Sequence, residues 1–158
     1  MKKLLTICLL LSILFTSNVY SQEKRDNRVL TFLEYIATNS SNTIIKYMEL
    51  NECKFLGDYE KTDHHKVYRF EDRRYSDEIS IEYLPSGKLL HISYDVTNLT
   101  IAIAKNDLHN YNFIAFNKSY CCSFFKRDDY PYQFATQEID DDYGIIRLIT
   151  KESELYIK

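Results

Sequence analysis

The chain has 158 residues, with 20 lysines and arginines against 23 aspartates and glutamates, which gives a formal net charge of −3 at pH 7. A mildly acidic chain is poorly suited to tracking a phosphate backbone, because that task needs clustered basic residues. The composition therefore argues against nucleic acid as a partner, and the length fits one domain behind a short leader.

The first segment has the charge and hydropathy order of a secretory signal peptide. Two lysines follow Met1, a mainly apolar run spans Leu4–Phe15, and a polar stretch ends at Ser21-Gln22. The apolar run is too short to span a bilayer comfortably. We therefore expect a signal peptide over residues 1–21 and a periplasmic or secreted mature chain, 22–158, without a membrane span. The Ser21-Gln22 junction resembles those of exported proteins of the Bacteroidetes.

Cleavage at that point would remove two lysines and leave 18 basic against 23 acidic residues, a formal charge of −5. Three cysteines would remain, Cys53, Cys121 and Cys122, and an export compartment permits one disulfide among them. Adjacent side chains on a strand point to opposite faces, so a Cys121–Cys122 bridge would be strained. We favour a disulfide from Cys53 to Cys121 or Cys122, and three reduced thiols are the alternative.

Helical spacing of apolar residues predicts two helices at the start of the mature chain. The first runs from about 28 to 38, and the second is capped by Ser41 or Asn42 and ends near Cys53. The inward residues of the second helix are predicted to be Ile44, Tyr47, Met48 and Leu50.

After the second helix the apolar residues recur at every second position, which predicts strands over 66–71, 79–83 and 90–94. Pro85-Ser86-Gly87 is a turn signal, so the last two strands form a hairpin. Each strand has one apolar and one largely polar face, as in an antiparallel sheet with helices on one side.

A third helix is predicted after Thr97 or Asn98. Residues 99–104 also alternate like a strand, but apolar side chains keep helical spacing further along, at Ile101, Ala104, Leu108 and Tyr111. Strands follow at about 119–126, 132–139 and 144–150, with a short last strand near 154–157.

The sequence also contains an internal similarity. The segment from Leu50 to Leu56 matches that from Leu108 to Ile114 at an offset of 58, and Gly87–Ser93 matches Gly144–Thr150 at an offset of 57. At an offset of 55, Phe70 and Tyr75 match Phe125 and Tyr130. The predicted fold class is α+β, with two tandem helix–three-strand units, 42–96 and 97–158, forming one six-stranded antiparallel sheet with helices on one face. Chance similarity is the alternative.

This order of elements over Asn42–Thr150 resembles, as topology only, the tandem helix-plus-sheet arrangement of exported bacterial domains of the beta-lactamase-inhibitor-protein-like and PepSY-like kinds. The resemblance implies a protein-binding or inhibitory role rather than catalysis.

The most metal-like motif is Asp63-His64-His65. Adjacent histidines point apart, whereas zinc sites need spaced ligands, so we expect a solvated loop and no metal site. His91 and His109 have no visible partner and are expected to be surface residues. The runs Asp128-Asp129 and Asp140–Asp142 lack the spacing of a calcium loop and are expected to be charged turns.

Catalytic motifs are also missing from the sequence. A thiol nucleophile at Cys121 or Cys122 would need a histidine such as His91, and nothing local supports that pairing. There is no glycine-rich phosphate loop, nucleophile elbow or His-Glu-x-x-His helix. We therefore expect a protein that is not an enzyme and holds no cofactor.

Tyrosine is abundant, with 14 residues, and is enriched at protein interfaces. The loops after the first predicted strand of each unit carry tyrosine beside charge, and we expect them at equivalent ends of the sheet. The candidate binding residues are Arg73, Arg74, Tyr75, Asp129, Tyr130 and Tyr132. The alternative is that Tyr75 and Tyr132 begin strands and pack inward.

Our first hypothesis is an exported, non-enzymatic domain that binds another protein, as an inhibitor or a periplasmic immunity protein, with acidic charge steering a basic partner. The alternative is an envelope structural or small-ligand-binding module. Its polar sheet face would meet the ligand through Arg69, Glu71, Glu82 and His91.

Overall fold

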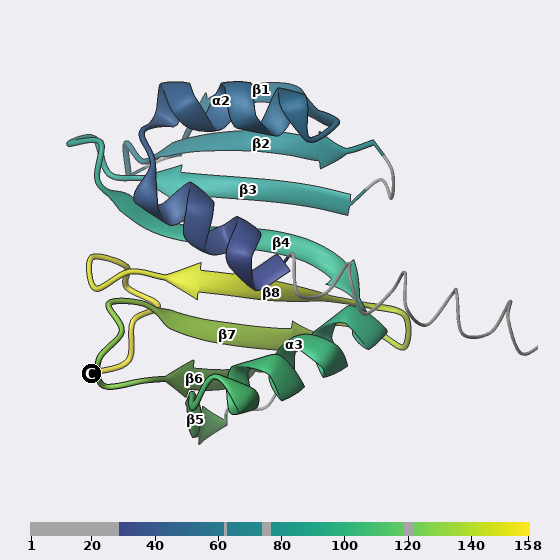
Figure 1. Cartoon of the computed structure of the whole chain (residues 1–158). Coiled ribbons are helices and arrows are strands. Elements are labelled where there is room, and N and C mark those ends of the chain that lie inside the picture. The colour runs from purple at the N-terminus through teal and green to yellow at the C-terminus, as the bar shows by residue number, and fades with distance from the viewer. Residues whose placement is uncertain (1–28, 62, 74–76, 119–121) are drawn as a thin grey trace, which may run out of the picture.

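A computed structural model describes residues 29–61, 63–73, 77–118 and 122–158, so the expected signal peptide lies outside the described residues. Over these residues the fold is α+β, with three helices and one eight-stranded antiparallel sheet (Figure 1). A first helix covers 29–38, followed by α2, Ser41–Leu50, and α3, Asn98–Asn110. All three lie on the same face of the sheet, as the alternating strands predicted.

The strand order in the sheet is β1-β2-β3-β4-β8-β7-β6-β5. Successive strands form two four-stranded meanders, and the pairing of β4 with β8 joins them. The strands are β1 (Cys53–Glu60), β2 (Lys66–Asp72), β3 (Asp77–Tyr83), β4 (Leu89–Thr97), β5 (Ile114–Lys118), β6 (Cys122–Lys126), β7 (Gln133–Glu138) and β8 (Tyr143–Ile149).

The prediction of six strands was wrong, because β1 and β5 were missed. Both are edge strands, each paired on one side only, so neither shows a clean alternation of apolar and polar residues. Each also contains a bulge, which leaves Leu56 unpaired in β1 and Phe116 unpaired in β5. A bulge shifts the period of two by one residue, which hides the strand pattern.

The short strand predicted near 154–157 is also wrong. Residues 151–155 form turns, and the end of the chain is held by a side chain instead of a neighbouring strand. Gln133 donates from Nε2 to the carbonyl of Ile157 at 2.6 Å and accepts the Ile157 N–H at 3.1 Å. Thr150 donates from Oγ1 to the carbonyls of Leu89 and Leu90, at 2.7 and 2.9 Å.

Helix α2 begins at Ser41, with Ser40 in the capping position, one residue before the predicted caps. Ile44 and Met48 are buried, as predicted, but Leu50 is 85% exposed. The reason is that the helix ends at Leu50, and Glu52 takes a left-handed conformation with φ of 64° that turns the chain into β1.

Helix α3 is confirmed where the sequence was ambiguous. The Thr97 side chain accepts the Thr100 N–H at 3.3 Å, so Thr97, one of the two caps predicted, is the N-cap. Ile101, Ala104 and Leu108 are fully buried against the sheet, whereas Tyr111 is 55% exposed at the C-cap.

The main core lies between the helices and the sheet. On β2, β3, β4 and β8 the inward side chains alternate with outward ones, so Phe70, Ile79, Ile92 and Ile146 are all fully buried. The first helix adds Phe32, whose ring packs 5.8 Å from that of Tyr94. The opposite sheet face carries the alternate residues, and most of the charged ones lie there.

The disulfide expectation is partly contradicted. Cys53 begins β1 and Cys122 begins β6, and five strands lie between those two in the sheet. With about 4.8 Å between neighbouring strands, the two cysteines lie on the order of 29 Å apart. A disulfide needs Cα atoms closer than about 7 Å, so Cys53 and Cys122 are not bridged. Cys121 lies outside the described residues.

The segments matched at offsets of 58 and 57 occupy different places in the two halves. Phe55 lies within β1, whereas Phe113 precedes β5. Gly87 lies in the turn between β3 and β4 with φ of 82°, whereas Gly144 lies inside β8.

Candidate functional site

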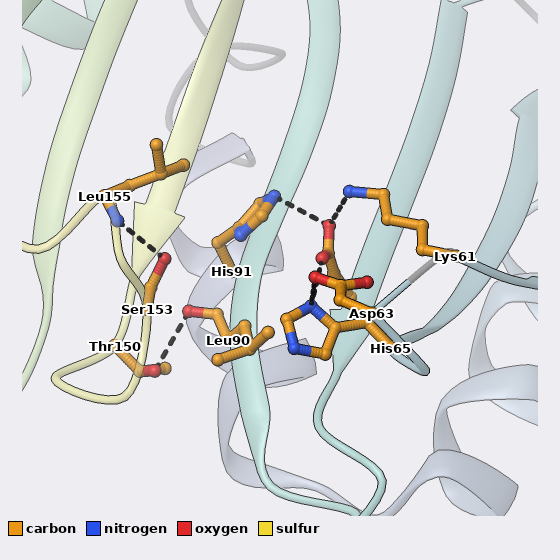
Figure 2. Close-up of polar contacts among 9 residues, drawn as sticks. Lys61, Asp63, His65, Leu90, His91, Thr150, Ser153 and Leu155 are labelled. Atoms are coloured by element: carbon orange, nitrogen blue, oxygen red, sulfur yellow. Dashed lines mark hydrogen bonds and ion pairs between the residues drawn. The ribbon is translucent and has the colours of Figure 1, made fainter.

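Glu82 is the most buried carboxylate on the sheet face opposite the helices. Ile79, Ile81 and Tyr83 point toward the core, so the alternate residue Glu82 points to the other face. Its side chain is 7% exposed, and its carboxylate has Lys61, His65 and His91 as neighbours. Figure 2 labels these three neighbours. We call this group the Glu82 cluster, and its members are Lys61, Asp63, His65, Glu82 and His91.

Each oxygen of the Glu82 carboxylate has partners of its own. Lys61 donates from Nζ to Oε2 at 2.5 Å, and Nε2 of His91 lies 3.4 Å from the same oxygen. Nδ1 of His65 lies 2.9 Å from Oε1. Oε2 therefore meets both the β1–β2 connection and β4, whereas Oε1 meets the β1–β2 connection.

Asp63 joins the cluster through His65. Its Oδ2 lies 2.9 Å from the same Nδ1 that faces Glu82. One ligand atom from each of Asp63, His65 and Glu82 thus lies within 4.8 Å of the other two. Two carboxylates and one imidazole nitrogen converge at this point of the surface.

The cluster shifts the titration of Glu82 and His91 in the same direction. Burial raises the pKa of the Glu82 carboxyl, but hydrogen bonds from Lys61 and His65, with His91 close by, outweigh burial and leave the pKa below its usual value. Burial lowers the pKa of His91, and the Glu82 carboxylate opposes this shift only in part. At pH 7 Glu82 is therefore ionised and His91 neutral.

The sequence expectation for this loop was half right. The adjacent histidines do point apart, since Nδ1 of His64 bonds Glu60 at 2.8 Å while His65 faces Glu82. However, the His65 side chain is only 19% exposed, so it is not a solvated loop residue. His91, expected without a partner, pairs across the sheet with Glu82.

A second feature stands at the opposite end of the sheet, where the β7–β8 hairpin meets the start of α3 (Figure 1). Three large apolar side chains are exposed here: Leu99 by 50%, Ile139 by 58% and Tyr143 by 51%. The turn between the last two is the exposed acidic run Asp140–Asp142. Gly144 faces Ile101 of α3, so the neighbouring Tyr143 points to the other face of the sheet, and Leu99 and Tyr143 stand on the two sides of the turn. We call this region the β7–β8 corner; it comprises Leu99, Ile139, Asp140, Asp141, Asp142 and Tyr143.

Hydrogen bonds fix the shape of the β7–β8 corner. The Asn98 N–H donates to the Asp142 carbonyl at 2.9 Å, and Asn98 Nδ2 donates to the Asp140 carbonyl at 2.6 Å. Asp140 Oδ1 accepts the N–H groups of Asp142 and Tyr143, which holds the pKa of its carboxyl below the usual value. The predicted charged turn is confirmed here.

The predicted binding residues are not brought together. Arg73 is exposed at the β2–β3 connection, and Arg74 and Tyr75 lie outside the described residues. The strand register places the β2–β3 connection and the β6–β7 connection at opposite ends of the sheet. Asp129, in the second connection, is exposed and accepts a hydrogen bond from Arg127 Nε at 2.6 Å.

Tyr130 and Tyr132 pack toward the core instead of pointing into solvent. The Tyr130 hydroxyl donates to Glu34 of the first helix, and its ring lies 5.1 Å from that of Phe113 and 5.5 Å from that of Tyr132. Arg127 covers the Tyr130 ring at 5.1 Å. These tyrosines join the first helix to the β6–β7 connection.

No protein-family model, curated protein or solved structure matches this chain. Within the described residues, no helix is long and apolar enough to cross a membrane.

Proposed function

We propose that the chain is an exported, non-enzymatic protein-binding domain, an inhibitor or periplasmic immunity protein, and that the β7–β8 corner is its contact surface. The observation that carries the proposal is the combination of three half-exposed apolar side chains with a rigid acidic turn between them. Exposed large apolar side chains, with aromatic ones among them, are typical of the part of a protein surface that a partner buries.

The charge of the β7–β8 corner favours a basic partner. Asp140, Asp141 and Asp142 are consecutive and exposed, and the whole chain carries a formal charge of −3. Complementary charge speeds encounter and excludes acidic competitors. Binding through this surface should weaken as ionic strength rises, because the exposed carboxylates are screened.

We also propose that the chain consists of two tandem units of the beta-lactamase-inhibitor-protein-like or PepSY-like kind. Features at a constant spacing of 60 positions support this. The helix C-caps Asn51 and Tyr111, the left-handed residues after them and the bulged residues of the next strand all share that spacing. So do buried pairs: Ile44 with Ala104, Met48 with Leu108, and Cys53 with Phe113.

A capture experiment tests the protein-binding proposal. The tagged protein is used to retain partners from envelope and supernatant extracts, together with a triple variant of the β7–β8 corner, Leu99→Ser, Ile139→Ser and Tyr143→Ser. The matched control is Tyr111→Ser with Ile114→Ser, which removes apolar groups exposed by 55% and 67% elsewhere.

The proposal expects one stoichiometric partner, retained by the wild type and the control but lost with the triple variant. Equal retention by the triple variant would show that the β7–β8 corner is not the contact surface. If the wild type retains no protein at low salt, protein binding itself is refuted.

A small-ligand-binding envelope module is the second candidate, and one observation favours it. Nδ1 of His91 is buried and meets no hydrogen-bond partner among the described residues. Buried polar atoms nearly always have a hydrogen-bond partner, so a small molecule bound beside His91 could supply the one that this nitrogen lacks. Saturable binding of a small molecule that fails in His91→Phe would favour this candidate.

A further inference from the structure

The geometry points to a binding site for one divalent transition-metal ion, best matched by zinc, formed by Asp63, His65 and Glu82. This departs from our expectation from sequence that the loop holds no metal. It is independent of the protein-binding proposal, because the Glu82 cluster and the β7–β8 corner lie at opposite ends of the sheet.

The donor atoms suit zinc in kind and in spacing. Zinc binds imidazole nitrogen and carboxylate oxygen at about 2.0–2.2 Å, which places the ligands of a tetrahedral site about 3.4 Å from one another. Here Nδ1 of His65 lies 2.9 Å from an oxygen of Asp63 and 2.9 Å from an oxygen of Glu82. Each carboxylate oxygen would need to move away from Nδ1 by only about half an ångström to admit the ion. The two oxygens lie within 4.8 Å of each other.

The number of hydrogens available on Nδ1 of His65 also favours a bound ion. Its Nδ1 carries at most one hydrogen, yet two carboxylate oxygens approach that nitrogen at the same distance. A cation between the three atoms would satisfy both carboxylates and use the nitrogen lone pair. Calcium fits less well, because it takes six to eight oxygen ligands and no nitrogen.

The surroundings hold the ligands in position. Lys61 and His91 both approach Oε2 of Glu82, which leaves Oε1 directed at His65. Partners of this kind orient a ligating carboxylate. The loop is closed by two backbone hydrogen bonds of 2.9 Å, from the Lys61 N–H to the His65 carbonyl and from the His64 N–H to the Lys61 carbonyl.

The charge balance permits a cation. Asp63 and Glu82 contribute two negative charges and Lys61 one positive charge, so the cluster carries −1 with neutral imidazoles. The Asp63 side chain is 53% exposed and the Glu82 side chain 7%, so the ion would reach the site from the Asp63 side. Three protein ligands would leave a fourth position for water or a partner group.

Calorimetric titration of zinc chloride into chelator-treated protein tests the site. We expect one ion per chain, and we expect His65→Gln and Asp63→Asn each to weaken binding at least about tenfold. The matched control is His64→Gln, because the neighbouring histidine is 78% exposed and faces Glu60 instead. That variant should bind zinc as the wild type does.

A second readout separates loss of the site from loss of the fold. Zinc should raise the melting temperature of the wild type and of His64→Gln, and leave that of His65→Gln unchanged, because only folded protein with the site binds the ion. Absence of saturable binding in the wild type would overturn the proposal. Equal loss in His64→Gln and His65→Gln would overturn it as well, since exposed loop histidines would then hold the ion.

Discussion

Gly144 lies where β8 passes beneath α3, and its lack of a side chain permits that approach. A Cβ atom there would come within 2.3 Å of the Gln137 carbonyl oxygen and within 2.3 Å of Cδ1 of Ile101. We predict that Gly144→Ala lowers the free energy of unfolding by about 2 kcal/mol, as forced overpacking does. Urea unfolding measures the effect.

The companion variant Ile101→Val removes the Cδ1 atom that the added methyl group of Gly144→Ala would meet. The double variant should therefore lose less stability than the sum of the two single changes, because one of the two overlaps is relieved. Additive losses would mean that Ile101 and Gly144 are not in contact, and a fully stable Gly144→Ala would contradict the placement of α3 over β8.

His91 predicts a pH dependence of stability. Burial lowers its pKa in the folded state from the usual 6.5, with Lys61 and Arg147 acting in the same direction and Glu82 and Glu154 opposing. Below about pH 6.5 the imidazole of the unfolded chain binds a proton, whereas that of the folded chain stays neutral to a lower pH. The contribution of neutral His91 to the free energy of unfolding is therefore complete above about pH 6.5 and is lost as the pH falls through the folded pKa.

The measurement is the free energy of unfolding between pH 7 and pH 5, for the wild type and His91→Gln. We expect a decline on acidification that is shallower in the variant, which has no imidazole to protonate at this position. Identical slopes would show that His91 does not titrate differently in the two states.

For single residues, the sequence predicted the sheet face on which a side chain lies but not the side chains that it contacts. Alternation places Glu82 and His91 on the polar face, yet their contact depends on the β3–β4 register, in which Glu82 pairs with His91. His65 lies 17 positions from Glu82, and the β1–β2 connection brings it there only because β1 exists. Since β1 was missed, the Glu82 cluster was missed with it.

Helices α2 and α3 both start after a hydroxyl residue, Ser40 and Thr97, so their N-caps can be compared directly. In both, the capping hydroxyl lies 3.0 Å from a threonine hydroxyl three residues on, Thr43 after Ser40 and Thr100 after Thr97. Only Thr97 also accepts a backbone N–H, whereas Ser40 makes no side-chain cap bond. We predict that Thr97→Ala costs about 1 kcal/mol of stability and Ser40→Ala clearly less. Equal costs in urea unfolding would contradict the capping difference.

The sequence predicted helices better than strands. The spacing of Ile101, Ala104 and Leu108 settled α3 correctly, because burial of that stripe determines the helix. The edge strands gave no comparable pattern, since a bulge interrupts each and only one side of each is paired. The similarity read from the sequence pairs Phe55 with Phe113 at an offset of 58, whereas the left-handed residues Glu52 and Asn112 are 60 positions apart.

For the whole molecule, the strand order predicts where the fold is most stable. β4 and β8 lie in the middle of the sheet and join the two meanders, whereas β1 and β5 are its edges. We predict that backbone amides of β4 and β8 exchange with solvent most slowly and those of β1 and β5 fastest, by hydrogen exchange with mass spectrometry. Two meanders that exchange as separate units would contradict a single sheet that unfolds cooperatively.

Site-specific photo-crosslinking in producing cells tests the proposed contact between the β7–β8 corner and a partner protein. A photoreactive phenylalanine analogue replaces Tyr143 in the corner or, as the control, Tyr111, whose exposure of 55% is close to the 51% of Tyr143. We predict one crosslinked protein from position 143 and none from position 111. No crosslink from position 143, or the same crosslink from both positions, would contradict it.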